Sequence, residues 1–425
     1  MKDIGQYKPY LTWLDTQHVT MCELLQRWAE VNSWSRNLPG LARMLSEVET
    51  ELQVLGGTSE RIDLPSQDLP EPDGAMVSQQ LGQALRVKKR QCAPLRVFLG
   101  CHVDTVYPPD HPFQRTIRAD AGTMIGPGVA DAKGGLLVML KALEAFERCP
   151  WVENLGWEIL INPDEEIGSP GSAHLLEEAA SHNHLGLVFE PCFPDGSFVG
   201  ARKGSGNFTV IARGKAAHAG RDPHLGRSAL SALAWLTVAL NAFAASESGI
   251  TVNVGYLHGG GPVNVVPDLA VCRFNARVET VRDQVMLEQY LSRVVEGIKI
   301  VDEVSLEQYG SFVRPPKPLD PSWKWLLERL VECGRDVGSE IEWRDSGGAC
   351  DGNNLAAQGL PTVDTLGVRG GEIHSSREYV VLDSLTERAK ITALFLMKLA
   401  AGEIRCPKES VSRSENGSST LPRMR

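Results

Sequence analysis

Residues 95–108 read LRVFLGCHVDTVYP, an apolar run that passes directly into polar side chains. The run 95–100 has the length and composition of a buried strand. His102 and Asp104 follow it at once. Open α/β sheets carry functional side chains just beyond the carboxyl ends of parallel strands, so the segment predicts such a sheet and a site at its edge.

From residue 95 onward, strand patterns alternate with helix patterns, which predicts a mostly parallel sheet covered by helices on both faces. The first ninety residues instead contain helical patterns near 19–31 and 41–55, followed by a turn-rich stretch around 64–74. The alternating elements are helix 134–148, strand 157–162, helix 172–180, strand 185–189 and, after residue 314, helix 323–337, strand 361–365 and helix 384–401.

The pattern changes between residues 204 and 313, where the order becomes strand, helix, strand, strand, helix, strand. That order is typical of a ferredoxin-like sandwich with both helices on one face of an antiparallel sheet. The simplest organisation is an α/β domain made of residues 1–203 and 314–405, with residues 204–313 inserted in it. Residues 406–425 are rich in serine and charge, and we expect them to form a flexible tail.

Composition limits the range of partners. The chain has 425 residues and a net charge of −10, which argues against nucleic acid or an anionic membrane as the main partner. No secretory signal is visible at its beginning, and the apolar stretch 229–245 is interrupted by polar residues, so we expect a buried helix there and no membrane span. None of the nine cysteines has a CxxC spacing, which favours reduced thiols in a cytoplasmic protein.

Acidic residues recur where predicted strands end. Strand 157–162 is followed by PDEEIGS, and strand 185–189 ends in Glu190. Adjacent Glu165 and Glu166 would repel each other after an apolar strand, and a bound cation would relieve that repulsion; a solvated acidic turn is the alternative. Asp131 lies in the glycine-rich turn GPGVADAKGG before a helix, where it could bind metal or merely cap the helix.

Two histidines complete a set of metal ligands. His102 follows the first strand, and His374 lies in the loop RGGEIHS after strand 361–365. Taken alone, His102 could be an ordinary turn histidine. Together, two histidines and three carboxylates at strand ends predict a two-metal site in which one carboxylate bridges. Nitrogen and oxygen ligands without thiolate suit Zn²⁺, with Co²⁺ or Mn²⁺ as substitutes.

Five motifs, HVDTVYP, GVADAKGG, PDEEIGS, FEP and EIHS, occur in this order along the chain. Together they resemble the dinuclear zinc aminoacylase and carboxypeptidase family, which includes glutamate carboxypeptidase, acetylornithine deacetylase, succinyl-diaminopimelate desuccinylase and cytosolic dipeptidases. The resemblance runs from about residue 97 to residue 401. It implies a zinc-peptidase domain with a mostly parallel sheet, and an inserted βαββαβ domain that serves in dimerisation and as a lid.

The resemblance also implies roles for the site residues. Asp131 would bridge two Zn²⁺ ions in each subunit, and a cis peptide would follow it. The remaining ligands would be His102 and Glu190 on one ion, and Glu166 and His374 on the other. Glu165 would act as general base or acid, and Asp104 would orient His102. In the implied reaction, a water that bridges the metals loses a proton to Glu165 and attacks the carbonyl carbon of an amide.

Four further residues match substrate-binding positions of the family. His218, in KAAHAGRDPHLGRSA, resembles a histidine that reaches the active site of a partner subunit, which implies a homodimer formed through the insert. Asn264, in GGGPVNVVPD, resembles a substrate-binding asparagine. Arg277 aligns with the arginine that holds a substrate carboxylate, a task that suits a planar fork of donors. Arg314, at the return from the insert, would assist it.

The expected activity is hydrolysis of the amide bond of a small peptide or N-acyl amino acid that has a free carboxylate. The resemblance is closest to the glutamate carboxypeptidase branch; the alternatives are an acetylornithine-type N-deacylase and a cytosolic dipeptidase. The segment HGGG, 258–261, resembles an esterase oxyanion motif, but the chain has no GxSxG. Two positions depart from the family: Cys101 replaces a glycine before His102 and has no ligand role, and the loop SGGACDG, 346–352, leaves the exact substrate open.

Overall fold

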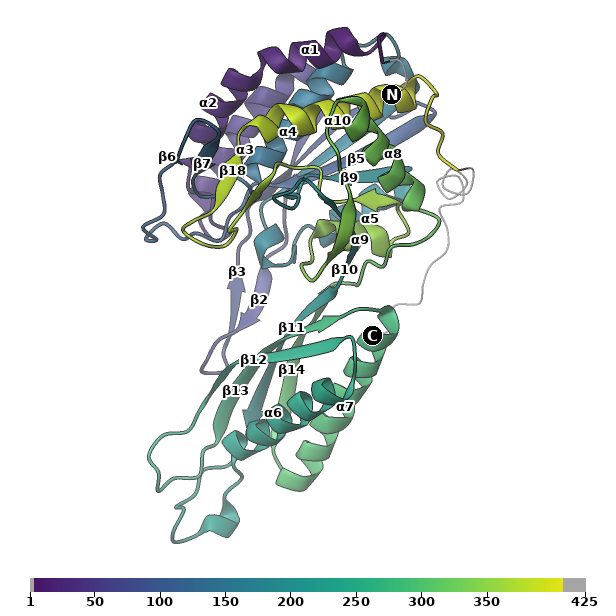
Figure 1. Cartoon of the computed structure of the whole chain (residues 1–425). Coiled ribbons are helices and arrows are strands. Elements are labelled where there is room, and N and C mark those ends of the chain that lie inside the picture. The colour runs from purple at the N-terminus through teal and green to yellow at the C-terminus, as the bar shows by residue number, and fades with distance from the viewer. Residues whose placement is uncertain (1–3, 408–425) are drawn as a thin grey trace.

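The computed structural model describes residues 4–407. Figure 1 shows these residues as a larger α/β part and a smaller part in which helices pack on a sheet. The expected tail, 406–425, lies outside the described residues from residue 408 onward.

The larger part is built on a six-stranded sheet in the order β1-β4-β8-β5-β9-β16. Strands β8, β5, β9 and β16 run parallel to one another. At one edge, β4 pairs antiparallel with β8, and β1 pairs antiparallel with β4. Every residue of β8 is buried, as expected of a strand covered on both faces. The mostly parallel sheet predicted from the sequence is therefore confirmed. The strands are β1 Thr58–Asp63, β4 Gln83–Lys89, β5 Leu95–His102, β8 Leu155–Asn162, β9 Leu185–Val188 and β16 Thr362–Val363.

Helices cover both faces of this sheet (Figure 1). Successive side chains of β5 point to opposite faces, so Val97 and Leu99 join the larger core while Phe98 joins the core under α5 and α9. The larger helical layer contains α1 Lys8–Thr16, α2 His18–Ala29, α3 Leu38–Leu52, α4 Lys133–Phe146, α8 Lys324–Asp336 and α10 Asp383–Ala400. The opposite face carries α5 Ala173–His182 and α9 Asp351–Ala357.

The smaller part, called the insert below, has the predicted βαββαβ order and its own hydrophobic core. Its strands pair antiparallel in the order β12-β13-β11-β14, and both helices pack on one face of the sheet. The chain enters the insert at the start of β11 and leaves it at the end of β14. The elements are β11 Gly204–Arg213, α6 Ala229–Ser246, β12 Ile250–Gly259, β13 Leu269–Val278, α7 Val281–Asp302 and β14 Ser305–Arg314.

Helix α6 is long and apolar enough to cross a membrane by length and composition alone. One face packs on the insert sheet through residues such as Leu233 and Leu236, which are fully buried. The outer face exposes Trp235 to 63% and Val238 to 59%. The expectation that the whole helix is buried is therefore wrong for this face. The reason is that α6 packs on the insert sheet with one face, and no described residue covers its outer face at Trp235 and Val238.

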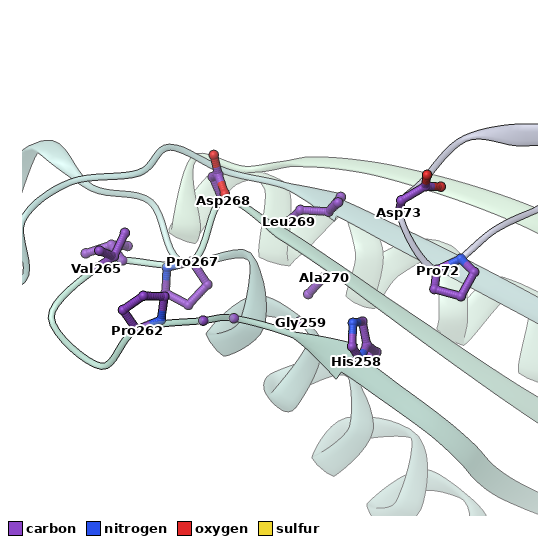
Figure 2. Close-up of a pocket in the computed structure, with 13 residues that line it drawn as sticks. Pro72, Asp73, His258, Gly259, Pro262, Val265, Pro267, Asp268, Leu269 and Ala270 are labelled. Atoms are coloured by element: carbon purple, nitrogen blue, oxygen red, sulfur yellow. The ribbon is translucent and has the colours of Figure 1, made fainter.

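A hairpin missed by the sequence analysis connects the two parts. The turn-rich stretch forms strands β2 (Gln67–Pro70) and β3 (Met76–Gln79), and the hairpin reaches the insert sheet. Arg273 donates to the carbonyl of Pro70 at 2.7 Å, and Arg213 donates to that of Gly74 at 2.8 Å. Between the hairpin turn and the β12–β13 connection lies a cavity of about 460 Å³ (Figure 2). The hairpin thus fixes the insert at a second place besides the chain crossings.

Two small sheets complete the larger part. One, in the order β17-β18-β7-β6, presents the loop that carries His374 between its first two strands. The other pairs β10 with β15. Their strands are β6 Ile117–Arg118, β7 Thr123–Ile125, β10 Phe198–Arg202, β15 Trp343–Ser346, β17 Gly370–Gly371 and β18 Tyr379–Val381.

Candidate metal centre and substrate cleft

Asp131 lies at the centre of the predicted site. Its Oδ1 is 3.1 Å from Nε2 of His102, and its Oδ2 is 3.4 Å from Nε2 of His374. The side chain does not cap α4, whose N-cap is Ala132 without a side-chain hydrogen bond, so the alternative of a helix cap is excluded. The peptide bond between Asp131 and Ala132 is cis, as the resemblance implied. Each carboxylate oxygen therefore faces a different histidine.

Two groups of candidate ligands share this carboxylate. One contains His102, Asp131 and Glu190, the other Asp131, Glu166 and His374, and within each group the donor atoms lie within 4.8 Å of one another. Nε2 of His102 is 3.8 Å from Glu190, and Nε2 of His374 is 3.1 Å from Glu166. These are the five ligands predicted from the sequence, divided between two positions as the resemblance implied.

The donor set fits two divalent cations. Imidazole nitrogens and carboxylate oxygens are typical zinc ligands. Burial and the neighbouring Asp131 carboxylate raise the pKa of Glu166 to about 8, and burial also raises the pKa of Glu190. Both shifts express the cost of crowding buried negative charge, which bound cations would remove.

Asp104 organises the site from beneath. The Nδ1 atom of His102 lies 3.0 Å from the Asp104 carbonyl oxygen and 3.3 Å from its Oδ1. The same carboxylate accepts the backbone N–H groups of Glu165 at 3.2 Å and Glu166 at 3.1 Å, and the Ser35 hydroxyl at 2.7 Å. Asp104 therefore orients His102 and also holds the acidic turn. The sequence did not predict that Asp104 holds the acidic turn or that Ser35 binds Asp104, because no local pattern connects these segments.

Another missed residue is Glu378, which holds the glycine-rich turn. Its carboxylate accepts backbone N–H groups from Gly128 at 3.0 Å, Ala130 at 2.9 Å and Asp131 at 3.1 Å. The Tyr107 hydroxyl donates to it at 2.8 Å. Glu378 is 247 residues from Asp131, and its own sequence, SSREYV, gives no signal of this role.

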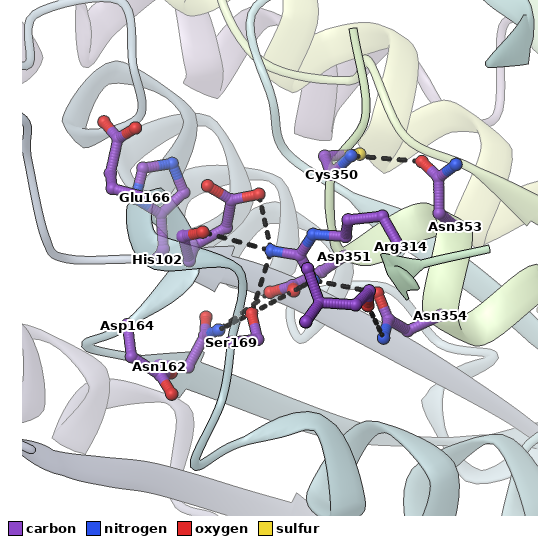
Figure 3. Close-up of polar contacts among 12 residues, drawn as sticks. His102, Asn162, Asp164, Glu166, Ser169, Arg314, Cys350, Asp351, Asn353 and Asn354 are labelled. Atoms are coloured by element: carbon purple, nitrogen blue, oxygen red, sulfur yellow. Dashed lines mark hydrogen bonds and ion pairs between the residues drawn. The ribbon is translucent and has the colours of Figure 1, made fainter. Parts of the chain in front are cut away.

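Glu165, the predicted general base, lies beside the ligands on a 3-10 turn, Glu165–Ile167. Burial raises its pKa to about 7, and the Arg314 guanidinium opposes that shift. Arg314 Nη2 donates to Glu165 Oε1 at 2.8 Å, and the arginine is 3% exposed. The sequence predicted that Arg314 assists substrate binding, whereas the structure buries it at the end of β14, where it binds the Glu165 carboxylate. Figure 3 shows Arg314 beside Ser169, Asp351 and Asn354.

A cavity of about 440 Å³ opens over the carboxylates. Arg277 lines it, as predicted, and so does Arg202, which the sequence analysis did not single out. The side chain of Arg202 lines the cavity, and its Nε is 2.9 Å from Oδ2 of Asp364. The loop 346–352, which departs from the family pattern, also lines the cavity, through Ser346, Gly348, Ala349 and Cys350. The lining of the cleft thus combines acidic side chains with two arginines.

His218 and Asn264 do not line this cavity. They lie near each other on the loops that follow β11 and β12, where the backbone N–H of Ala219 donates to the Asn264 carbonyl at 2.8 Å. Figure 1 shows these loops at the end of the insert that is far from the six-stranded sheet. The structure therefore keeps the two residues together and separates them from the cleft of their own chain.

The chain is similar to known peptidases and acyl amino acid hydrolases. Residues 98–398 match the model of peptidase family M20/M25/M40. The chain is 25% identical to carboxypeptidase G2 of Pseudomonas sp. (strain RS-16), over 89% of each chain. It is 30% identical to a succinyl-diaminopimelate desuccinylase of Pseudomonas syringae pv. syringae, over 72% of this chain and 84% of the relative.

Solved structures share the fold. A metallo-carboxypeptidase from Sulfolobus solfataricus superimposes with a TM-score of 0.69 at 17% identity, covering 90% of this chain and 99% of that one. The aminopeptidase PepT of Bacillus cereus gives a TM-score of 0.68 at 20% identity with the same coverage. With the family model spanning the strand-end ligands and the insert between them, the chain belongs to the peptidase family M20/M25/M40.

Proposed function

We propose that the protein is a dinuclear zinc exopeptidase or aminoacylase whose substrate has a free carboxylate next to the scissile amide. Family membership makes it a metal-dependent hydrolase of amide bonds in peptides or acyl amino acids. The observation that carries the finer proposal is the cleft itself. Carboxylates of the two ligand groups that share Asp131 line it, and Arg277 lines the same cavity.

The protein side chains have distinct tasks in this proposal. Bound cations would polarise the scissile carbonyl and make water a better nucleophile. Glu165 takes the proton from the attacking water and passes it to the leaving amine, which suits a carboxylate whose pKa burial raises to about 7. Asp104 keeps the His102 ring in place through its Nδ1.

Arg277 is the proposed partner of the substrate carboxylate. Its Nε donates to Asn275 Oδ1 at 3.2 Å and its Nη1 to the Gly347 carbonyl at 3.4 Å, so β13 and the loop 346–352 hold the guanidinium. A planar guanidinium held in this way is suited to bidentate pairing with a carboxylate. An N-deacylase of the acetylornithine type and a dipeptidase remain the alternatives within the same chemistry.

A substrate panel tests this proposal. We expect the metal-free protein to be inactive and Zn²⁺ or Co²⁺ to restore hydrolysis of some N-acyl amino acids or dipeptides. Each substrate is paired with its carboxamide, which should react at least about tenfold more slowly because it loses a charged hydrogen bond to Arg277. Turnover that survives complete metal removal would refute the metal-dependent mechanism, and equal rates for acid and carboxamide would refute the carboxylate requirement.

We further propose a cytoplasmic homodimer in which His218 and Asn264 complete the partner's cleft. Two observations support the dimer. The outer face of α6 is apolar and exposed at Trp235 and Val238, and such a face favours contact with another protein surface. The two predicted substrate-binding residues lie together on the insert, outside the cleft of their own chain.

Mixed dimers test whether His218 acts in trans. We expect His218→Ala and Glu165→Gln to be inactive alone, and equal amounts co-refolded to regain about one quarter of wild-type activity. The reason is that half of the dimers would be mixed, and each mixed dimer has one complete cleft. If His218 acts within its own chain, mixing restores nothing. Co-refolding either variant with itself is the control.

A further inference from the structure

Arg314 ends β14, so its backbone belongs to the insert while its side chain reaches into the larger part. Its Nη1 donates to Asp351 and, at 2.8 Å, to Oδ1 of Asn354. Its Nη2 donates to the Ser169 hydroxyl at 2.9 Å and to two oxygens of Glu165, Oε1 at 2.8 Å and the backbone carbonyl at 3.1 Å. Both terminal nitrogens are therefore engaged inside the protein.

These bonds fix the orientation of the general base. Because one nitrogen binds both the carbonyl and the carboxylate of Glu165, it restricts the backbone and the side chain together. Oε1 is occupied by Arg314, whereas Oε2 has no hydrogen bond within residues 4–407, which leaves Oε2 to take the proton. Although burial opposes it, the carboxylates of Asp351 and Glu165 raise the pKa of Arg314, so the guanidinium stays charged.

Asp351 anchors this arrangement to the main sheet. Its Oδ1 accepts from the Ser169 hydroxyl at 2.6 Å, and its Oδ2 accepts from Nδ2 of Asn162, the last residue of β8, at 2.8 Å (Figure 3). Asp351 is 5% exposed. Nη1 of Arg314 is therefore held by Asp351, and Asp351 is itself held by Asn162 at the end of β8.

The same short helix, α9, holds both chain crossings to the insert. Nδ2 of Asn353 donates to the carbonyls of Lys203 at 3.1 Å and Pro315 at 2.7 Å. Nδ2 of Asn354 donates to the carbonyl of Val313 at 3.0 Å. A shift of the insert at these crossings would move Arg314 and, through it, the carboxylate of Glu165.

We propose that Arg314 is a positioning residue that holds Glu165 in its reactive orientation and ties that orientation to the seating of the insert. The inference rests on the proposed role of Glu165 as general base. It also separates two arginines that the sequence analysis assigned to one task. Arg277 lines the cleft, where the proposed function assigns it to the substrate carboxylate, whereas Arg314 acts through Glu165.

Kinetics of zinc-loaded Arg314→Lys and Arg277→Lys distinguish these roles. For Arg314→Lys we expect kcat to fall about 10- to 100-fold, as for other residues that orient catalytic groups, with KM and the preference for acid over carboxamide unchanged. Arg277→Lys is the matched control, and its KM should rise about tenfold with loss of that preference. An Arg314→Lys enzyme that instead behaves like Arg277→Lys would overturn the proposal.

A double variant tests whether Arg314 acts through Glu165. In a Glu165→Gln background, Arg314→Lys should cause little further loss, because residues that act as a unit are not additive. Full multiplication of the two losses would contradict the proposal. Thermal unfolding and zinc content show that each variant is folded and loaded, and Asp351→Asn replaces Arg314→Lys if the latter does not fold.

A structural readout needs no substrate. In a crystal structure of zinc-loaded Arg314→Lys, we expect the Glu165 carboxylate to leave its wild-type position while His102 and Asp131 keep theirs. An unchanged Glu165 side chain would refute the positioning role even if the substrate were unknown. If the wild-type enzyme hydrolysed no amide of the panel, the proposed function would fail while this measurement still decided the role of Arg314.

Discussion

Replacement of Glu165 by glutamine is expected to lower kcat by about 1,000-fold, within the range that general acid–base groups contribute, without loss of bound zinc. Glutamine keeps the size of the side chain and can still accept a hydrogen bond from Arg314, but its amide cannot take a proton from water. The ligand groups exclude Glu165, so metal content should stay at the wild-type value. Steady-state kinetics and metal analysis of the purified enzyme measure the two effects.

The matched control is Glu153→Gln, an exposed glutamate of the same chemistry outside the cleft, which should keep wild-type kinetics. A Glu165→Gln enzyme with unchanged turnover would show that another group moves the proton. Loss of zinc together with activity would instead assign Glu165 to the metal ligands.

Replacement of Asp131 by asparagine is expected to remove most of both bound cations and reduce hydrolysis to background. Each oxygen of Asp131 faces one of the two ligand groups, and asparagine offers one neutral oxygen in place of two that share a negative charge. Zinc content measured after gel filtration should fall well below that of the wild type. The thermal midpoint in excess zinc should rise less than for the wild type, because ligand binding to the folded state stabilises it.

Asp110→Asn, an exposed aspartate, serves as the control and should bind zinc like the wild type. If Asp131→Asn retained the wild-type zinc content, the carboxylate would not bridge, and the two groups would be independent sites.

The sequence predicted three of the ligands well because each of these three follows a strand whose apolar pattern is readable by itself. His102 ends β5, Glu166 follows β8, and Glu190 follows β9. Adjacent parallel strands bring their carboxyl ends to the same edge, so residues far apart in the chain meet there without further information. The βαββαβ order of the insert was predicted for the same reason, since its periodicity alternates cleanly between strand and helix.

The prediction failed where a residue's role depends on a partner that no local pattern indicates. Arg314 resembled a substrate residue, yet its guanidinium binds Glu165 and Asp351. Strands β2 and β3 looked like an irregular stretch because Pro70 and Pro72 interrupt it and it has few apolar residues. The two strands pair with each other, and β2 also accepts a hydrogen bond from the insert at Pro70.

By itself, the sequence determined the α/β class, the insert and which side chains stand at the edge of the sheet, because short-range periodicity and strand order dictate these. Only the tertiary structure decided what supports those side chains. Glu378 beneath the glycine-rich turn, Asp104 beneath the acidic turn and Arg314 behind Glu165 all act through hydrogen bonds between distant segments. Such bonds form only after packing has brought the segments together, and so they leave no periodic trace in the chain.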